Sequence, residues 1–181
     1  MNICVFGAAR DEIDPGFIAL GEAFGRALAR GGHTMIFGGG AHGLMGAAAR
    51  GCAEEGGRIV SVVPYFFSEP GVLWEDCAEL IRMDTLAERK TVMEERADAF
   101  AVLPGGVGTL DEFFEVLTMR NLGRHNKPIA LLDHDGYWLP AAEMLSASVE
   151  RGFAAPGVLE LFRCFTDPSE CLTWFAKEAG K

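Results

Sequence analysis

Residues 99–112 read AFAVLPGGVGTLDE, and this stretch decides the fold. Its first five residues are all apolar, which is typical of a short strand buried on both faces of a parallel sheet. Pro104 and the glycines after it indicate a turn, and residues 110–122 then carry apolar side chains at helical spacing. A buried strand that passes through a glycine-rich turn into an amphipathic helix is the repeating unit of α/β proteins.

The same alternation extends in both directions from this stretch. We expect strands at residues 3–7, 34–37, 58–63, 99–103 and 128–132, with a weaker candidate at 78–81. We expect helices at residues 18–29, 45–54, 88–96, 110–122 and 141–149, and a last helix near 169–179. The pattern predicts an α/β fold: a Rossmann-like, doubly wound parallel sheet with helices on both faces, in a single domain over residues 1–181.

Ligands of such sheets bind beyond the carboxyl ends of the strands, where loops lead into helices. Loops with glycine follow three of the predicted strands, at residues 7–9, 38–46 and 104–109. The functional residues are therefore expected in these loops, and Gly39 and Gly40 of the second loop are candidates for substrate contact.

The third loop has the features of a phosphate-binding site. The absence of side chains at Gly105, Gly106 and Gly108 lets a ligand approach the backbone closely. The N–H groups of a first helical turn lack partners within the helix, so they can bind a phosphate, and Thr109 adds a hydroxyl. Such turns also serve packing alone, but the density of glycine and the acidic residues that follow favour a binding site, which includes Val107.

Asp111 and Glu112 follow this loop on the predicted helix. Acidic residues in a first turn stabilise a helix through its dipole, and this explanation fits Asp111. Glu112 can in addition lie beside the sugar of a nucleotide whose phosphate occupies the helix start. Glu112 is therefore a candidate site residue.

Arg89 and Lys90 are the best candidates for cations that bind an anionic ligand. Adjacent cations on a helix usually form a solvated face. The formal net charge is −10, however, so a small anionic ligand needs local positive groups. No cluster of Lys and Arg offers a surface for a nucleic acid, and a small-molecule nucleotide is the expected ligand.

Other classes of site lack their sequence patterns. The P-loop pattern and the G-x-S-x-G pattern of serine hydrolases are absent. The histidines and cysteines show no spacing typical of metal ligands, so no metal site is expected; of the histidines, only His42 lies in a glycine-rich loop. The strand predicted at residues 58–63 lacks the acidic residue that binds the ribose of NAD, which disfavours an NAD-dependent oxidoreductase.

The chain also lacks the pattern of a membrane or secreted protein. No apolar run approaches the roughly 20 residues that span a bilayer. Met1 leads into the apolar residues 3–6 without a basic flank or a cleavage site. The five cysteines are an odd number without a framework pattern, so reduced thiols and a cytoplasmic location are expected.

Three motifs occur in this chain in a fixed order. Residues 38–46 read GGGAHGLMG, residues 88–93 read ERKTVM and residues 104–112 read PGGVGTLDE. Together they resemble the LOG family, the cytokinin-activating phosphoribohydrolases formerly labelled lysine decarboxylases. The resemblance extends from residue 3 to about residue 175.

The resemblance implies an α/β enzyme, forming dimers, that hydrolyses AMP or N6-substituted adenosine monophosphates to free base and ribose 5-phosphate without a cofactor. The family's essential arginine and glutamate correspond to Arg89 and Glu112, so both are expected to be catalytic. Glu112 would stabilise the positive charge that develops on the sugar as the N-glycosidic bond breaks. Its phosphate and ribose contacts correspond to Lys90 and residues 106–109, with a further ligand contact at Thr118. Which of the two bases is preferred stays open.

Two alternatives remain from the sequence. A non-catalytic nucleotide or cofactor carrier of the same fold would share the phosphate-binding loop, although it has little use for a carboxylate beside the phosphate. Apolar residues of the helix at 110–122 belong either to a homodimer interface or to the core: Phe113, Val116 and Leu117.

Overall fold

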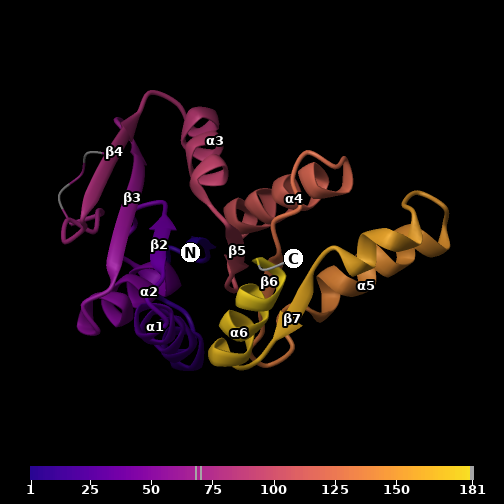
Figure 1. Cartoon of the computed structure of the whole chain (residues 1–181), viewed down its shortest axis with the longest axis horizontal. Helices are drawn as coiled ribbons and strands as arrows, with labels where there is room; N and C mark the ends of the chain where they lie inside the picture. Colours follow the sequence, from indigo (N-terminus) through magenta and orange to yellow (C-terminus); the bar gives the residue numbers. More distant parts are fainter. Residues whose placement is uncertain (68, 70, 180–181) are drawn as a thin grey trace.

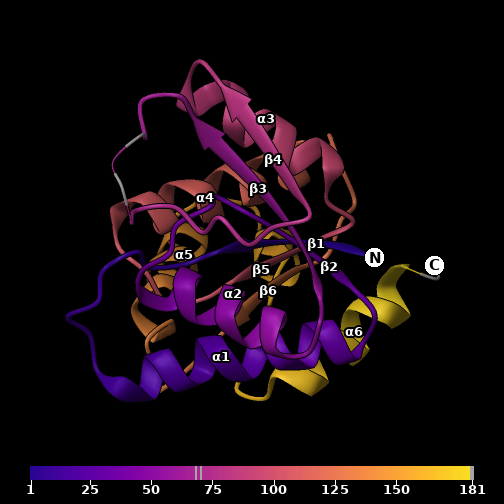
Figure 2. The ribbon, with the colours of Figure 1, turned by 90° about the vertical axis from the view of Figure 1, so that its left-hand side faces the viewer.

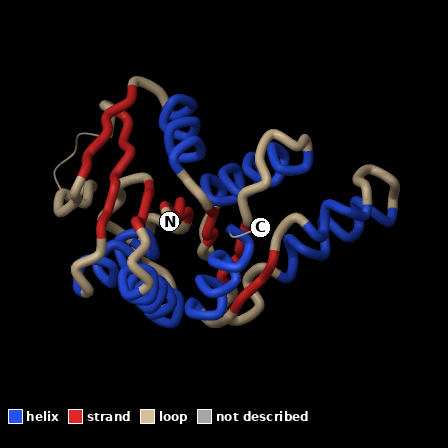
Figure 3. Tube along the Cα trace, in the orientation of Figure 1, coloured by secondary structure: helices blue, strands red, loops and turns tan. Residues whose placement is uncertain are grey.

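The computed structural model describes residues 1–67, 69 and 71–179, and it contains a seven-stranded sheet flanked by helices (Figures 1 and 3). The strand order is β4-β3-β2-β1-β5-β6-β7, and each neighbouring pair is parallel. The strands are β1 (Asn2–Phe6), β2 (Thr34–Phe37), β3 (Arg58–Pro64), β4 (Glu79–Met83), β5 (Ala99–Val102), β6 (Ile129–Leu132) and β7 (Arg163–Phe165).

Helices cover both faces of this sheet. One hydrophobic cluster joins the sheet to α1, α2 and α6, and a second joins it to α3, α4 and α5. Figure 2 shows α1 and α2 side by side on their face. The helices are α1 (Pro15–Arg30), α2 (Gly43–Glu54), α3 (Leu86–Arg96), α4 (Val107–Asn121), α5 (Leu139–Glu150), the short 3-10 helix η1 (Pro156–Glu160) and α6 (Pro168–Ala179).

Alternating residues of the central strand enter the two clusters. Ile3 and Val5 belong to the cluster under α1 and α2, whereas Cys4 and Phe6 belong to the one under α3 and α4. Because both faces of β1 are covered, residues 3–6 of this strand are all apolar. Full burial of one such aliphatic or aromatic side chain contributes about 1.5–3 kcal/mol, so the strands anchor the loops at their ends firmly.

The strand order reverses direction between β1 and β5. From β1 the chain proceeds outward to β4, returns through α3 to β5, and then proceeds outward to β7. The connections that leave β1 and β5 therefore diverge, which opens a crevice at the carboxyl ends of these two strands. This crevice is where the fold favours a ligand.

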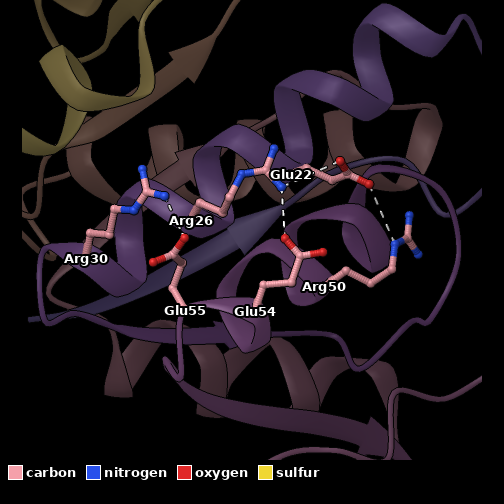
Figure 4. Close-up of polar contacts among 6 residues, drawn as sticks. All are labelled: Glu22, Arg26, Arg30, Arg50, Glu54 and Glu55. Atoms are coloured by element: carbon pink, nitrogen blue, oxygen red, sulfur yellow. Dashed lines mark hydrogen bonds and ion pairs between the residues drawn. The ribbon is translucent and has the colours of Figure 1, made fainter.

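Helices α1 and α2 cross with their backbones in close contact. A Cβ atom on Gly25 would lie 2.0 Å from the carbonyl oxygen of Ala48, and one on Gly51 would lie 2.2 Å from that of Glu22. Ion pairs span the outer side of this crossing (Figure 4), and one joins Arg26 to Glu54 at 3.0 Å. Exposed ion pairs contribute at most about 1 kcal/mol each, so the glycines set how closely the helices approach.

The predicted fold is confirmed, and the differences from the prediction are two short elements that were missed and the bounds of several helices. The weak candidate strand at residues 78–81 is β4, whereas β7 and η1 were not predicted, because they are short and β7 has two exposed residues. Helix α1 begins at Pro15 rather than residue 18, since Asp14 caps it by accepting a hydrogen bond from the N–H of Gly16 at 2.7 Å.

Two further expectations can be compared with the structure. Phe113, Val116 and Leu117 are buried in the second cluster, so their interpretation as core is confirmed and they offer no dimer surface. Among the described residues, no helix is both long and apolar enough to cross a membrane.

Candidate active site

A cavity of about 710 Å³ lies at the point where the strand order reverses. This is a size typical of small-molecule sites. Its walls come from the loops that follow β1, β2, β5 and β6 and from the β3–β4 connection, and Arg89 and Glu112 reach it from α3 and α4.

The start of α4 offers free hydrogen-bond donors to this cavity. Gly106 is the N-cap, and no side chain caps the helix. The N–H of Leu110 donates to the carbonyl of Gly106 at 3.0 Å. Within the described part of the chain, no group accepts the N–H groups of Val107, Gly108 and Thr109. Free N–H groups at the positive end of a helix dipole are suited to bind an anion such as phosphate.

The glycines of this loop serve two different structural roles. A Cβ atom on Gly105 would lie 2.1 Å from the hydroxyl of Thr109 and 2.8 Å from the backbone nitrogen of Ala8, so this glycine permits tight packing. A Cβ atom on Gly106 or Gly108 would meet nothing within 4 Å. At these two positions the missing side chain leaves room on the cavity side for a ligand.

The start of α2 differs, because the protein already uses most of its donors. The carboxylate of Asp11 accepts the N–H of Gly43 at 2.9 Å, and the carbonyl of Ala8 accepts that of Met45 at 3.1 Å. Of the first three N–H groups of α2, only that of Leu44 has no acceptor among the described residues. The α4 start is therefore the better phosphate site of the two.

The second glycine loop instead shapes the cavity wall. Gly38 and Gly40 line the cavity, but Gly39 is not among the described lining residues. A Cβ atom on Gly39 would lie 2.4 Å from Val63, and its φ of 74° is one that other residues rarely adopt. Of the two predicted substrate contacts in this loop, Gly40 therefore lies at the cavity, whereas Gly39 packs against β3.

Arg89 and Glu112 face each other at the cavity. Nη2 of Arg89 lies 3.7 Å from Oε1 of Glu112, and the two side chains are 15% and 13% exposed. Nε of Arg89 donates to the carbonyl of Val62 at 3.1 Å, which orients the guanidinium. A Cβ atom on Gly38 would lie 1.7 Å from Nη2. Gly38 therefore provides the space that this guanidinium occupies.

Burial raises the pKa of Glu112 to about 7, and the positive charge of Arg89 opposes this rise. A carboxyl group with such a pKa exchanges its proton near neutral pH. Perturbed groups of this kind concentrate at functional sites, and the pair stands beside the free donors of α4.

Other predicted site residues lie outside the described lining of the cavity. Nζ of Lys90 lies 3.0 Å from Oδ2 of Asp111 and also contacts Glu115, so it bridges α3 and α4. These contacts, first that with Glu115, keep the pKa of Lys90 above its usual value. Thr118 is exposed on α4, and the side chain of Val107 is 83% exposed.

Residues that the sequence did not single out complete the cavity. Tyr137 enters from the loop after β6, and Phe17 enters from α1. His42, the histidine that the sequence places in a glycine-rich loop, also lines the cavity. Its ring lies between Asp11 and Gly71, with Nδ1 2.7 Å from Oδ2 of Asp11 and Nε2 3.0 Å from the carbonyl of Gly71. The Asp-Gly pair before Tyr137 indicates a turn, but the sequence does not show where the turn aims this side chain.

The described residues contain no group of three or more His, Cys, Asp or Glu side chains that could hold a metal ion. The described lining instead offers the guanidinium groups of Arg10 and Arg89, the free N–H groups of the α4 start and the hydroxyl of Thr109, with the carboxyl group of Glu112 beside Arg89. This arrangement suits an anionic ligand.

Comparison with known proteins gives sequence relatives over most of the chain. The family model described as "possible lysine decarboxylase" matches residues 45–175. The cytokinin riboside 5′-monophosphate phosphoribohydrolase of Rhodococcoides fascians is 38% identical over 156 residues, covering 86% of this chain and 79% of that protein. The protein of the same name from Mycobacterium tuberculosis is 41% identical over 143 residues, covering 79% of this chain and 76% of that protein.

Solved structures with the same fold include molybdenum cofactor proteins. The molybdenum cofactor carrier protein of Chlamydomonas reinhardtii matches with a TM-score of 0.73 and 20% identity over 99% of this chain and 98% of that chain. The molybdenum cofactor binding protein of Rippkaea orientalis matches with a TM-score of 0.71 and 18% identity, covering 97% of this chain and 95% of that chain. At these identities the likeness shows the fold alone.

Proposed function

Because this chain belongs to the family of the cytokinin riboside 5′-monophosphate phosphoribohydrolases, whose model is described as possible lysine decarboxylase, we propose that it hydrolyses the N-glycosidic bond of purine nucleoside 5′-monophosphates. The products are the free base and ribose 5-phosphate. Substrates of this class are AMP and its N6-substituted, cytokinin-type derivatives. The names of the relatives agree with the phosphoribohydrolase predicted from the motifs.

One observation carries this proposal: a buried Arg89–Glu112 pair, 3.7 Å apart, stands beside a helix start with free N–H groups. The free donors of Gly108 and Thr109 bind the 5′-phosphate, which positions the sugar over the pair. As the bond to the base breaks, positive charge grows on the sugar, and the ionised carboxylate of Glu112 stabilises it and orients water. Arg89 supplies positive charge to the leaving base or to the nucleotide.

A carrier without turnover is the second candidate, because molybdenum cofactor carriers share the fold. A carrier of an anionic ligand gains nothing from a buried carboxyl group beside its phosphate, whereas a hydrolase does. The Arg89–Glu112 pair therefore favours the enzyme.

The test is incubation of the purified protein with AMP, its isopentenyl derivative and adenosine, followed by chromatography of the free base. We expect base to be released from the monophosphates and at least tenfold more slowly from adenosine, because the phosphate contributes binding energy. Equal turnover of AMP and adenosine contradicts the role of the α4 start. Calorimetric binding of AMP without release of adenine favours the carrier.

We also propose that the protein forms a homodimer. Large apolar side chains are exposed on the side of α4 and α5: Leu122 is 64% exposed, Met144 66% and Phe153 82%. Helix α5 buries none of its described residues fully. Thr118, which the family resemblance assigns to the ligand, lies outside this chain's cavity and could reach a ligand only across an interface.

Two coarser proposals concern the whole chain. Residues 1–181 form one domain, since the described elements share a single sheet, and we expect one cooperative thermal transition. The protein works in the cytoplasm, where its cysteines stay reduced: all five are free, and Cys4, Cys52 and Cys171 are buried. Titration of five thiols in the unfolded protein from freshly lysed cells would agree with this location.

A further inference from the structure

Tyr137 connects two neighbouring strand ends at the cavity. Its hydroxyl donates a hydrogen bond to the carbonyl oxygen of Gly105, and its side chain lines the cavity. Tyr137 follows β6 and Gly105 follows β5, and these strands pair in parallel. The contact therefore reaches the phosphate-binding loop from outside that loop.

A tight turn aims Tyr137 at this carbonyl. The N–H of Tyr137 donates to the carbonyl of His134 at 3.2 Å, and the two residues between them, Asp135 and Gly136, have φ values of 55° and 71°. Positive φ at both central positions is the requirement of a type I′ turn. Among the described residues, Asp135 is the one non-glycine residue with positive φ. The Asp133 carboxylate accepts the N–H of Gly136 at 3.0 Å and so fixes the turn.

Aromatic neighbours hold the phenol ring in place. The ring of Tyr137 packs edge to face with Phe17, at 6.0 Å between centroids and 79° between planes. It also packs edge to face with Trp138, at 5.1 Å and 89°. The residue is 37% exposed, and these two contacts orient its ring so that the hydroxyl meets the carbonyl of Gly105.

The peptide between Gly105 and Gly106 needs such a tether. Glycine adopts both signs of φ at little cost, so a peptide flanked by two glycines can rotate easily. In a trans peptide the carbonyl and the next N–H point in opposite directions. Gly106 lines the cavity, and its N–H has no acceptor among the described residues. A rotated 105–106 peptide would replace this free N–H by a carbonyl oxygen, which would repel an anion.

We propose that Tyr137 is a positioning residue for phosphate binding: its hydroxyl holds the Gly105 carbonyl and thereby fixes the loop that starts α4. The proposal rests on the proposed function, because it concerns how the same cavity binds the phosphate of a nucleoside 5′-monophosphate. It predicts that Tyr137 affects ligands with a phosphate and leaves ligands without one unaffected.

The test is the variant Tyr137→Phe, which keeps the ring and removes the hydroxyl. Its binding of ribose 5-phosphate and of adenine is measured by calorimetry, with thermal unfolding recorded on the same samples. We expect the Kd of ribose 5-phosphate and the KM of AMP to rise about five- to tenfold, the effect of losing one hydrogen bond. The Kd of adenine and kcat should change less than twofold.

Tyr65→Phe is the matched control, because the same atom is removed from the other tyrosine of the chain. Tyr65 is 60% exposed and is not among the described residues that line the cavity. We expect this control to bind both ligands as the wild type does.

The possible outcomes distinguish the positioning role of Tyr137 from the proposed hydrolase function. Unchanged affinity of Tyr137→Phe for ribose 5-phosphate overturns the inference, and so does an equal loss for both ligands or a lower Tm alone. If the wild type binds ribose 5-phosphate but does not hydrolyse AMP, the proposed hydrolase function is wrong. A selective loss of ribose 5-phosphate affinity in Tyr137→Phe would then still support the positioning role of Tyr137. A wild type that hydrolyses AMP but binds no ribose 5-phosphate overturns the inference about Tyr137 and leaves the hydrolase standing.

Discussion

The side chain of Glu112 is 13% exposed and its carboxylate lies 3.7 Å from the guanidinium of Arg89, which makes this residue sensitive to substitution. Glu112→Gln keeps the shape and removes the charge that the transition state needs. We expect turnover of AMP to fall by a factor of about 10² or more, while the affinity for AMP stays within a few-fold. Steady-state rates and calorimetric binding on the same variant measure the two effects. Near-normal turnover in a folded variant would remove Glu112 from the mechanism.

The raised pKa of Glu112 also predicts how stability depends on pH. The folded protein binds this proton more tightly than the unfolded chain, whose carboxyl has a pKa near 4.5, against about 7 in the folded state. The stabilisation is therefore complete below pH 4.5 and is lost as the pH rises through 7. Its size is up to about 3 kcal/mol, because one unit of pKa corresponds to about 1.4 kcal/mol.

Denaturant unfolding of wild type and Glu112→Gln at several pH values isolates this effect. Glu94, whose pKa burial also raises to about 7, is common to both proteins and cancels in the difference. We expect the variant to gain stability over the wild type between pH 4.5 and 8. A difference that stays constant over this range would contradict the raised pKa.

The sequence could predict those site residues that follow the ends of adjacent strands. Topology alone brings loops of parallel strands to one edge, so Gly105, Thr109 and Glu112 could be placed at a site from sequence. The contacts of Lys90 depend on how α3 packs against α4, and no local sequence pattern predicts that packing. The position of the Tyr137 side chain depends on one turn after the neighbouring strand β6.

At the scale of elements, the α1–α2 crossing positions the loop after β1, because the N–H of Met45 donates to the carbonyl of Ala8. Gly25→Ala would normally favour a helix, but here the new Cβ meets the backbone of Ala48 and Cys52, at 2.0 and 2.8 Å. We expect the free energy of unfolding to fall by about 1–3 kcal/mol.

Gly157→Ala serves as the control for this crossing, since a Cβ atom on Gly157 meets nothing within 4 Å. Chemical denaturation of both variants should show a loss for Gly25→Ala and less than about 0.5 kcal/mol for Gly157→Ala. Equal stabilities would mean that the helices separate without cost.

The strongest helix and strand patterns were predictable for a physical reason. Strands β5 and β6 consist entirely of buried apolar residues, and β1 and β2 are apolar after their first residues, Asn2 and Thr34, so nothing polar interrupts the signal within them. The edge strand β7 has two exposed residues of three, and its sequence resembles a loop. Its place follows from pairing with β6, a contact between distant parts of the chain.

At the scale of the whole molecule, the proposed dimer makes a prediction about Phe153. If this exposed ring lies in the interface, Phe153→Asp should lower the dimer fraction at micromolar concentration, since a charge would be buried against apolar partners. Leu80→Asp, on β4 at the opposite edge of the sheet, is the control. Sedimentation velocity gives the masses, and a wild type that sediments as a monomer would exclude the dimer.

The position of β1 between β2 and β5 has a consequence for synthesis on the ribosome. Ile3 pairs with Met35 on one side and with Ala99 on the other. One side of β1 can therefore be paired early, whereas the other has no partner strand until residues 99–102 have left the exit tunnel. An unpaired strand edge attracts other chains. Nascent chains stalled before residue 99 should thus be cut rapidly by protease and bound by chaperones, and chains stalled well beyond β6 should resist both.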